Sequence, residues 1–342
     1  MRAPEPNERE PSDSVRIALS VGCPCGIGPE VAIAAAAALS SDVHLVLHGD
    51  EGAILEAARV RSIDLRSLRH VTIAGTPPLA VGNRSPGAPT VAAGEAQRVA
   101  IDAALSTLVV GRADALVTGP VSKYAITSAG ARFTGHTEYL EAALHATHSV
   151  MMFAGPTLRT TLVTTHLPLA WVSAAVTPQR VARVIEATAE SLRDDFGVRA
   201  PRIVVCGLNP HAGENGLLGR EEIDAITPGI LAARARIAGF ATVVGPVGAE
   251  TAFRRARDGA WDVVVAMTHD QATIASKLVD FGQAVNVTLG LPIVRTSVDH
   301  GTGYDIAGQG VADAGGMIAA VELAVKIVRR RRASAPARAM RV

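Results

Sequence analysis

The sequence is poor in aromatic residues and in cysteine. Aromatic side chains make up 3% of its 342 residues, too few to suggest a surface on which the bases of single-stranded nucleic acid stack. Three cysteines are an odd number in so long a chain, which argues against a disulfide framework and favours a reducing compartment. The formal net charge of +1 gives the chain no overall attraction for a polyanion.

Targeting and membrane segments are also lacking. Residues 1–13 are polar and rich in proline, without the apolar stretch of a signal peptide. No apolar run reaches the roughly 18 residues that a membrane-spanning helix needs. We therefore expect a cytoplasmic protein with neither a membrane nor a nucleic acid partner. Residues 1–13 and the basic tail 331–342 are predicted to be disordered.

Short β-branched runs alternate with alanine-rich segments along the chain. Such alternation predicts an α/β fold with a largely parallel sheet covered by helices, and the length suits two domains or one large unit. The expected strands lie within 15–22, 43–49, 70–75, 114–120, 149–155, 158–166, 202–211, 262–269, 284–291 and 293–301. The clearest expected helices are 29–40, 94–109, 177–196 and 221–239.

The stretch Gly22–Glu30, GCPCGIGPE, holds two of the three cysteines between an expected strand and an expected helix. Its glycines allow a tight turn that could present backbone N–H groups to an anion, and Pro29 suits the first position of a helix. A metal site would need further soft ligands, and only Cys206 remains. A redox pair is more usually Cys-x-x-Cys. We expect a structural or ligand-contacting turn, with the chemistry elsewhere.

Three histidines, His166, His211 and His269, each end a separate strand-like run. The carboxyl ends of strands in an open α/β sheet meet at one crevice, so these side chains can converge there. Three neutral imidazoles are a known ligand set for a divalent cation. The alternative is that each histidine anchors a loop by hydrogen bonds. Asp270 and Asn209 adjoin two of the histidines and could orient them.

Two further groups of polar residues suit an anionic ligand. Lys277, Asn286 and Arg295 follow His269 and offer a point charge, an amide and a forked donor for a phosphate or a carboxylate. His136 and Thr137, in GHTEYL, stand where a helix begins and would face a ligand at its N-terminus. Alternatively, the first three are solvated or strand-edge residues and the last two only cap the helix.

These motifs carry a family resemblance that extends from about residue 15 to residue 328. The segments GIGPE, TGPVSK, FTGHTEYL, TTHLPL, VCGLNPHAGENGLLGREEID, HDQ, VNVTLGLP and RTSVDHGTGYDIAG resemble the 4-hydroxythreonine-4-phosphate dehydrogenase family of pyridoxal phosphate biosynthesis. The resemblance implies a two-domain α/β/α fold like that of isocitrate and isopropylmalate dehydrogenases. It also implies NAD or NADP as cofactor, a divalent zinc, magnesium or cobalt ion, and a homodimer. The implied domains are 14–135 with 305–330, and 136–304.

The resemblance also assigns roles to residues. It implies His166, His211 and His269 as metal ligands, and His136, Thr137, Lys277, Asn286 and Arg295 as substrate contacts. More loosely, it places His300, Gly301, Thr302 and Asp305 at the cofactor. Asp270 and Lys277 are the candidate catalytic residues, with Asp270 a candidate to take the hydroxyl proton. In the family the active site is shared, and we expect His269, Lys277, Asn286 and Arg295 to reach across the dimer interface.

The implied reaction oxidises the secondary alcohol of 4-phosphooxy-L-threonine (4-hydroxythreonine 4-phosphate) with NAD. The resulting β-keto acid would decarboxylate to 3-amino-2-oxopropyl phosphate. Three departures leave other substrates open: Cys23 stands where the family usually has an acidic residue, Glu250 where many members have aspartate, and HDQATIASK differs from the commoner HDQG continuation. The alternatives are threonate or erythronate 4-phosphate, another hydroxy acid and a dihydrodiol. From another class, a phosphate-ligand binding or acyl- or phosphoryl-transfer protein on a similar fold also stays open.

Overall fold

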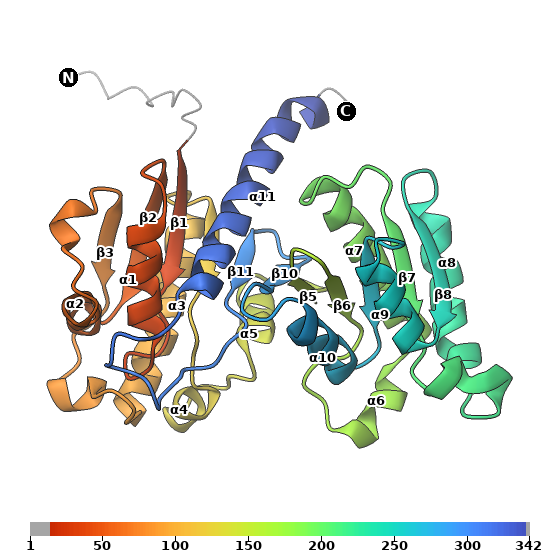
Figure 1. Ribbon diagram of the computed structural model, residues 1–342, viewed down its shortest axis with the longest axis horizontal. Helices are drawn as coiled ribbons and strands as arrows, with labels where there is room; N and C mark the ends of the chain where they lie inside the picture. The colour runs from red at the N-terminus through yellow and green to blue at the C-terminus, as the bar shows by residue number, and fades with distance from the viewer. Residues whose placement is uncertain (1–13, 340–342) are drawn as a thin grey trace.

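One continuous sheet runs through the computed structural model, which describes residues 14–339 (Figure 1). Its 11 strands lie in the order β3-β2-β1-β4-β11-β10-β5-β6-β9-β7-β8. The strands are β1 Val15–Ser20, β2 Val43–Gly49, β3 Val71–Gly75, β4 Ala115–Thr118, β5 Val150–Ala154, β6 Arg159–Leu162, β7 Arg202–Cys206, β8 Thr242–Val247, β9 Val263–Ala266, β10 Val285–Leu289 and β11 Arg295–Ser297.

Helices follow most strands, and threonines at their starts explain several boundaries. Thr177 accepts a hydrogen bond from Arg180 N with proline next in the chain, and Thr268 forms a capping box with Gln271. The α-helices are α1 Gly28–Ala38, α2 Glu51–Val60, α3 Val91–Val109, α4 Lys123–Ser128, α5 His136–Ala143, α6 Leu169–Ala175, α7 Pro178–Asp194, α8 Thr227–Ile237, α9 Ala249–Arg257, α10 His269–Val279 and α11 Gly315–Ala339. Short helical segments are η1 Leu65–Ser67, η2 Val81–Arg84, η3 Pro210–Gly216 and the π-helical η4 Glu222–Ile226.

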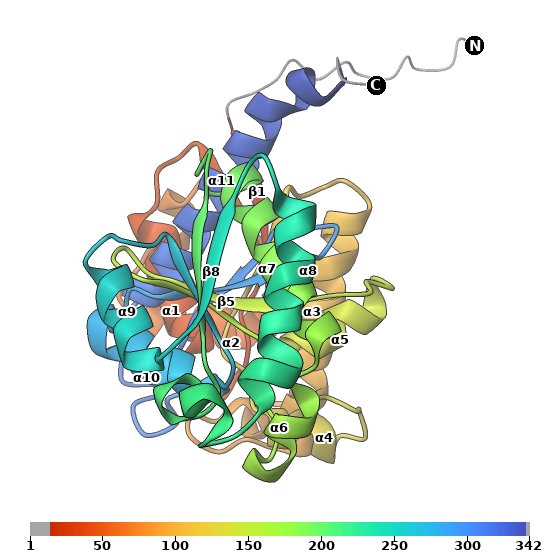
Figure 2. The same ribbon diagram turned by 90° about the vertical axis from the view of Figure 1, so that its right-hand side faces the viewer.

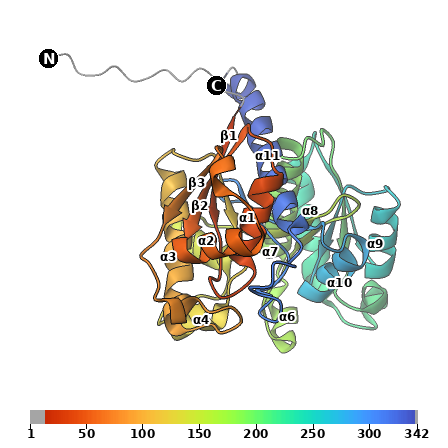
Figure 3. The same ribbon diagram turned by 60° about the vertical axis from the view of Figure 1, so that its left-hand side comes forward.

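Helices cover both faces of the sheet. Around β1 to β4, α1, α2 and α11 pack on one face and α3 on the other (Figure 3). Around β7 to β9, α7 and α8 lie on one face and α9 on the other (Figure 2). Alternate strand residues therefore enter two different apolar cores: Ile203 and Val205 face α7 and α8, whereas Val204 faces α9.

The strand pairs are parallel except at the centre of the sheet. β10 is antiparallel to both of its neighbours, β11 and β5, and β5 is antiparallel to β6. All ten expected strands are present. The strand that the sequence did not reveal is β8, which contains Gly245 and Pro246. Both residues normally argue against a strand, but an edge strand tolerates them because one side of its backbone needs no ladder partner.

The C-terminal helix is longer than expected. α11 continues to Ala339, so the predicted disordered tail is helical from residue 331 to that point. Arg331 and Arg332 form ion pairs with Asp195 and Asp114. The expectations for residues 1–13 and 340–342 fall outside the described residues. The predicted domain division stays a prediction, because the sheet crosses it without a break. Between residues 14 and 339, no helix is long and apolar enough to span a membrane.

Candidate active site

A cavity of about 180 Å³ lies at the middle of the sheet, beyond the end of β4. It receives side chains from α5, β10, β11 and the segments that follow β6 and β9. This is the crevice position where open α/β sheets bind ligands. Its polar lining consists of Lys123, His136, Thr137, Glu138, His166, His269, Asn286, Arg295, Ser297 and His300.

Arg295 is the most deeply buried charged residue of this cavity. The side chain is 2% exposed, and its two terminal nitrogens donate to the hydroxyls of Thr288 at 2.9 Å and Thr118 at 2.6 Å. Its Nε has no partner, and Arg295 forms no ion pair with a carboxylate of the described residues, although the charge of Glu138 on the same cavity favours the cation from farther away. Burial lowers the pKa of Arg295 to about 9, so it is still a cation at neutral pH. A buried cation without a counter-ion is costly, which makes this a favourable place for an anion.

His136 is the first residue of α5 and lies beside that cation. Burial, followed by the charges of Arg295 and Lys123, holds its pKa well below the ordinary value, so the ring is neutral. Its Nε2 is buried without a hydrogen-bond partner. Thr137, the next residue, is buried too and lines the same cavity. The start of α5 therefore supplies neutral groups beside the arginine.

Buried polar atoms without partners are concentrated at this cavity. Nine such side-chain atoms occur among the described residues, and five of them belong to residues that line it. These five are His136 Nε2, Glu138 Oε2, Asn286 Oδ1, Arg295 Nε and His300 Nε2. Buried polar groups in proteins are nearly always hydrogen-bonded, so five orphans in one place indicate that a polar ligand completes the site.

Two of the three strand-end histidines meet here. The rings of His166 and His269 have centroids 5.5 Å apart, and both line the cavity. Two imidazoles bound to one tetrahedral metal ion have ring centres roughly 5 Å apart, so the pair fits that chemistry. Asp270 Oδ1 lies 2.8 Å from His269 Nδ1, which leaves Nε2 of His269 for a ligand. Glu138 lies 3.8 Å from His166 Nδ1.

His211 does not join them within one chain. It is exposed, lies on η3 and does not line the cavity. Across residues 14–334, no group of three or more His, Cys, Asp and Glu side chains could hold a metal ion. The expectation that His269, Lys277, Asn286 and Arg295 reach across a dimer interface stays a prediction. Within one chain, His269, Asn286 and Arg295 line the same cavity as His136 and His166, because β9 pairs with β6 and because β10 and β11 are central strands of the sheet.

The segment that carries His211 has an unusual backbone. Five consecutive residues, 211–215, have left-handed φ and ψ angles, and four of them are not glycine. Each such residue costs on the order of 1–2 kcal/mol, so the surroundings must impose this conformation. The buried Glu222 holds the residues that lead into the segment and packs against Gly213: its Oε1 accepts from Leu208 N and Asn209 N at 2.8 Å each, and its Oε2 from Asn209 Nδ2 at 2.9 Å.

The two candidate catalytic residues lie at the margin of the cavity. Asp270 has a side chain that is 82% exposed and contacts His269. Lys277 donates to Asp299 O at 3.2 Å, with the Asp299 carboxylate 3.6 Å away. Burial raises the pKa of that carboxyl group. Neither Asp270 nor Lys277 lines the cavity, although Asp299 directly precedes His300, which does.

The predicted cofactor residues form a loop against the cysteine-containing turn. His300 lines the cavity, Thr302 O accepts from Ile27 N at 2.8 Å, and Gly301 and Asp305 are exposed. The turn must contain glycine at residue 26, because a Cβ there would lie 2.5 Å from Thr302 O. The buried Glu30 accepts from Gly308 N at 2.6 Å and Gly310 N at 2.9 Å, and so fixes the far end of the loop.

Sequence reasoning missed three polar residues of the cavity, Lys123, Glu138 and Ser297. Lys123 and Glu138 lie in TGPVSK and GHTE, which were recognised as motifs without a role for these residues. The available signal was position: Lys123 begins α4 shortly after β4 ends, and Glu138 is in the first turn of α5. Ser297 is on the same side of β11 as Arg295, two residues away.

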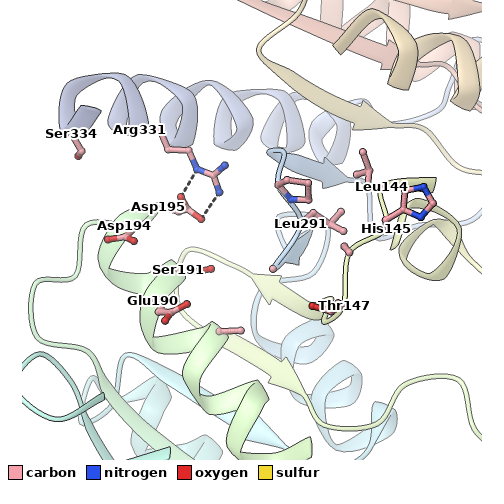
Figure 4. A pocket seen from close by; sticks show the side chains of 14 residues that line it. Leu144, His145, Thr147, Glu190, Ser191, Asp194, Asp195, Leu291, Arg331 and Ser334 are labelled. Atoms are coloured by element: carbon pink, nitrogen blue, oxygen red, sulfur yellow. Dashed lines mark hydrogen bonds and ion pairs between the residues drawn. The ribbon is translucent and has the colours of Figure 1, made fainter. Parts of the chain in front are cut away.

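A larger cavity, of about 640 Å³, lies away from these residues, between α7, α11 and the loops around His145 and Leu291 (Figure 4). Glu190, Asp194 and Asp195 line it, and Arg331 pairs with Asp195 across it at 2.7 Å. None of the predicted site residues lines this cavity, and none of the unpartnered buried atoms belongs to its lining. The smaller cavity is therefore the better candidate for the active site.

Comparisons with known proteins identify the family of the chain. The family model described as "Pyridoxal phosphate biosynthetic protein PdxA" matches residues 28–324. A 4-hydroxythreonine-4-phosphate dehydrogenase of Burkholderia vietnamiensis is 45% identical over 94% of this chain and 99% of its own length. A crystal structure of the Klebsiella pneumoniae enzyme of that name is 33% identical, with a TM-score of 0.78 over 92% of this chain and 99% of that one.

Two other structures show how far the fold extends. A terephthalate 1,2-cis-dihydrodiol dehydrogenase from Burkholderia xenovorans is 31% identical, with a TM-score of 0.63 over 92% of this chain and 98% of that one. An isocitrate dehydrogenase from Methylococcus capsulatus is 16% identical, with a TM-score of 0.51 over 94% and 88%. The second likeness shows the fold alone and confirms the expected fold class. By the family model and the near full-length relatives, the chain belongs to the PdxA family of pyridoxal phosphate biosynthetic proteins.

Proposed function

We propose that the chain is a cytoplasmic, metal-dependent 4-hydroxythreonine-4-phosphate dehydrogenase. It would oxidise the secondary alcohol with NAD and release 3-amino-2-oxopropyl phosphate after decarboxylation. The observation that carries the proposal is the buried Arg295, which has no carboxylate partner and faces a small cavity lined by histidines. The names of near full-length relatives support it.

The substrate would be held through its phosphate. Arg295 supplies the permanent positive charge, and Lys123 adds a second from the start of α4. The neutral His136 can donate a hydrogen bond from Nε2, and Asn286 Oδ1 can accept one from a donor group of the substrate; neither atom has a partner in the protein. The cavity is smaller than those that hold drug-sized molecules, which suits a compact phosphorylated acid. With the phosphate fixed, the reacting carbon would be oriented towards the histidines.

His166 and His269 would hold the divalent metal ion, zinc, magnesium or cobalt, together with His211 of a second copy. When bound, such an ion supplies a Lewis acid that lowers the pKa of the substrate hydroxyl. The chain's own contribution is orientation: Asp270 fixes the ring of His269 through Nδ1, and Glu138 lies beside His166. Asp270 and Lys277 stay candidates for moving the hydroxyl proton, from positions at the cavity's margin.

NAD, or NADP, would bind along the loop of His300, Gly301, Thr302 and Asp305. NAD accepts the hydride from the alcohol carbon, and the ketone that forms accepts the electrons released when carbon dioxide leaves. The loop is held at both ends, by Ile27 N at Thr302 and by Glu30 at Gly308 and Gly310. A second cavity of about 360 Å³, lined by Pro24, Glu30 and Gly308 among others, adjoins it and offers room for a nucleotide.

A homodimer would complete each site. Large apolar side chains are exposed on elements beside the site: Ile274, Leu278 and Phe281 on and after α10, and Leu169 and Trp171 on α6. α10 begins at His269, and α6 begins shortly after His166. Exposed apolar groups of this kind mark protein interfaces, and a two-fold axis would give two equivalent sites. Each site would take His211 from the partner.

NADH formation by the purified protein tests the proposal. The panel contains 4-hydroxythreonine 4-phosphate, threonate and erythronate 4-phosphates, an unphosphorylated hydroxy acid and an aromatic cis-dihydrodiol, each with added zinc, magnesium or cobalt. We expect the highest kcat/KM with 4-hydroxythreonine 4-phosphate and loss of turnover with a chelator. A preference for the dihydrodiol, as the name of the Burkholderia xenovorans relative suggests for that protein, would contradict the proposal.

The same assay separates the proposal from a binding or transfer function on a similar fold. A phosphoryl- or acyl-transfer enzyme has no need of a nicotinamide. Binding of NAD to the purified protein is therefore expected under the proposal, and its absence at millimolar concentrations would favour a transfer function. The assay is needed because fold alone does not determine chemistry.

A further inference from the structure

Two thiols meet in the turn that supports the cofactor loop, and the proposed reaction uses neither. Cys23 and Cys25 are fully buried, and a hydrogen bond from Gly26 N to Cys23 O at 3.1 Å closes the four-residue turn around Pro24. The first and third residues of such a turn have Cα atoms roughly 5–6 Å apart, which is within the range that a disulfide spans. The two cysteines are free in this structure.

Each thiol contacts a different segment of the cofactor site. Cys23 Sγ lies 3.3 Å from the hydroxyl of Tyr304, which belongs to the cofactor loop. Cys25 Sγ donates to Asn83 O at 3.4 Å, on η2. Tyr304 packs on the small cluster that the two cysteines form with Ala93. The loop therefore depends on the thiol form of the turn for one of its side-chain anchors.

The neighbouring thiol also favours ionisation of Cys23. A hydrogen bond from Cys25 lowers the pKa of Cys23 to about 7, and a second from Tyr304 acts in the same direction. The pKa of Cys25 is raised by the same pairing. Cys206 is a natural contrast: it is buried alone, and burial raises its pKa to about 12. Thiolates are the nucleophilic form of cysteine, so the turn holds one nucleophile with a second thiol beside it; because both are buried, peroxide reaches them when the turn opens locally.

We propose that Cys23 and Cys25 are a hydroperoxide-sensitive pair that controls the cofactor loop. The Cys23 thiolate attacks one oxygen of hydrogen peroxide, the O–O bond breaks, and hydroxide leaves and is protonated to water. The sulfenic acid of Cys23 is then attacked by the sulfur of Cys25, which forms the S–S bond and releases a second water. Two thiols lose two electrons in total, and the peroxide gains them.

The disulfide would remove the contact of Cys23 with Tyr304 and that of Cys25 with Asn83. Neither sulfur has a proton to share afterwards, and Cys23 turns from Tyr304 towards Cys25. A disulfide across one intervening residue is also strained, and strained disulfides are readily reduced again by thiols. The control would therefore be reversible. Its effect on cofactor binding rests on the proposed function of the loop.

The test uses the full-length protein in its reduced form. It is titrated with hydrogen peroxide, and three quantities are followed: intact mass, the peptide that contains both cysteines, and NAD affinity. We expect a mass loss of two hydrogen atoms located at Cys23 and Cys25. NAD affinity should fall by about tenfold, as expected when one or two hydrogen bonds that order a binding loop are lost. Dithiothreitol should restore the original mass and the original NAD affinity, and bound NAD should slow the oxidation.

Three variants make the outcome decisive. Cys23→Ser and Cys25→Ser should each bind NAD with an affinity that peroxide does not change, whereas Cys206→Ser should respond like the wild type. The proposal is overturned if no internal disulfide forms between Cys23 and Cys25, or if it forms and NAD affinity is unchanged. If the reduced protein binds no NAD at all, the proposed function fails. In that case, limited proteolysis of the loop at residues 300–310 tests the cysteine pair. Equal cleavage rates of the oxidised and the reduced protein would overturn the proposal.

Discussion

At the scale of single residues, Arg295 combines burial with two hydroxyl partners and no counter-ion. We predict that Arg295→Lys raises the KM for the phosphorylated substrate by about 10–100-fold, because a lysine keeps the charge but loses the forked geometry. NAD affinity should change little. Steady-state kinetics measure both, and a melting curve shows whether the variant is folded.

Arg202 provides the matched control for this prediction. It pairs with Asp262 at the surface, and Arg202→Lys should leave both constants unchanged. If Arg295→Lys weakened the binding of NAD and the binding of substrate equally, Arg295 would have a general structural role and the anion site would lie elsewhere.

Asp270 can orient a metal ligand or take a proton, and one variant separates these roles. If Asp270 orients His269, Asp270→Asn should weaken metal affinity by about 10–100-fold, and excess metal should restore turnover. If Asp270 takes the hydroxyl proton, turnover should stay low at saturating metal. Metal titration and kcat are the two measurements. Asp258→Asn, at an exposed ion pair with Arg257, is the control that should alter neither.

Cys23 gives a dependence on pH that can be measured without substrate. Its pKa is lowered to about 7, so the thiol is protonated well below that pH and ionised above it. The rate of oxidation by hydrogen peroxide should therefore rise about tenfold per pH unit below 7 and level off above about pH 8. Stopped-flow measurement of peroxide consumption follows it. A rate that is flat between pH 5.5 and 7 would show that Cys23 does not react as a thiolate of this pKa.

At the scale of elements, the left-handed segment at residues 211–215 depends on one carboxylate from η4. Glu222→Ala should lower the free energy of unfolding by about 3 kcal/mol, since three backbone and side-chain donors lose a charged acceptor. It should also lower the metal bound per subunit, because His211 is no longer presented. Denaturant unfolding and metal analysis check the two effects.

Asp224→Ala is the control for that change. Asp224 lies on the same element but is exposed and pairs with Arg220, so its loss should be nearly neutral. Glu222→Gln should be intermediate, because its amide nitrogen would face Asn209 Nδ2 as donor against donor. Full metal content in Glu222→Ala would show that the segment keeps its shape without the carboxylate.

The elements that sequence predicted well are those in which local signals and burial agree. The strands around Ile17, Ile203 and Val264 are apolar runs bounded by turns, and Thr177 with Pro178 starts a helix in the ordinary way. β8 was missed because its glycine and proline are normal breakers, and only its place at the sheet edge permits them. The backbone of 211–215 has no local signal, since a distant carboxylate holds it.

The candidate site was predictable to a similar extent. His136, Asn286 and Arg295 were identified from their types and motifs, and the structure brings them to one cavity. The sequence did not show which histidines of one chain lie together, because this depends on the order of the strands in the sheet. β9 returns to pair with β6, so His269 lies beside His166, and β10 and β11 cross back to the centre of the sheet with Asn286 and Arg295.

At the scale of the whole molecule, the placement of the histidines gives a specific complementation pattern. If His166 and His269 of one chain act with His211 of the partner, mixing inactive His211→Ala and His269→Ala subunits restores one intact site in each mixed dimer. Random exchange makes about half of the dimers mixed, so activity should recover to about a quarter of wild type.

The matched negative control is the pair His166→Ala and His269→Ala. Both changes damage the same half of a site, so each mixed dimer has two defective sites and activity should stay at zero. Native mass spectrometry verifies the exchange. Recovery in both pairs would place His269 across the interface from His166 and His211.

The central position of β11 also has a consequence during synthesis on the ribosome. β4 pairs with β1 early, but its other neighbour is β11, and Arg295 on that strand is 177 positions beyond Thr118. At roughly 5–20 residues per second, the nascent chain carries β4 as an open edge for about 10–35 s. For most of that time β5 also lacks its neighbour β10. A growing chain with two unpaired strands is a natural client for a chaperone, and the substrate-binding arginine is among the last parts to arrive.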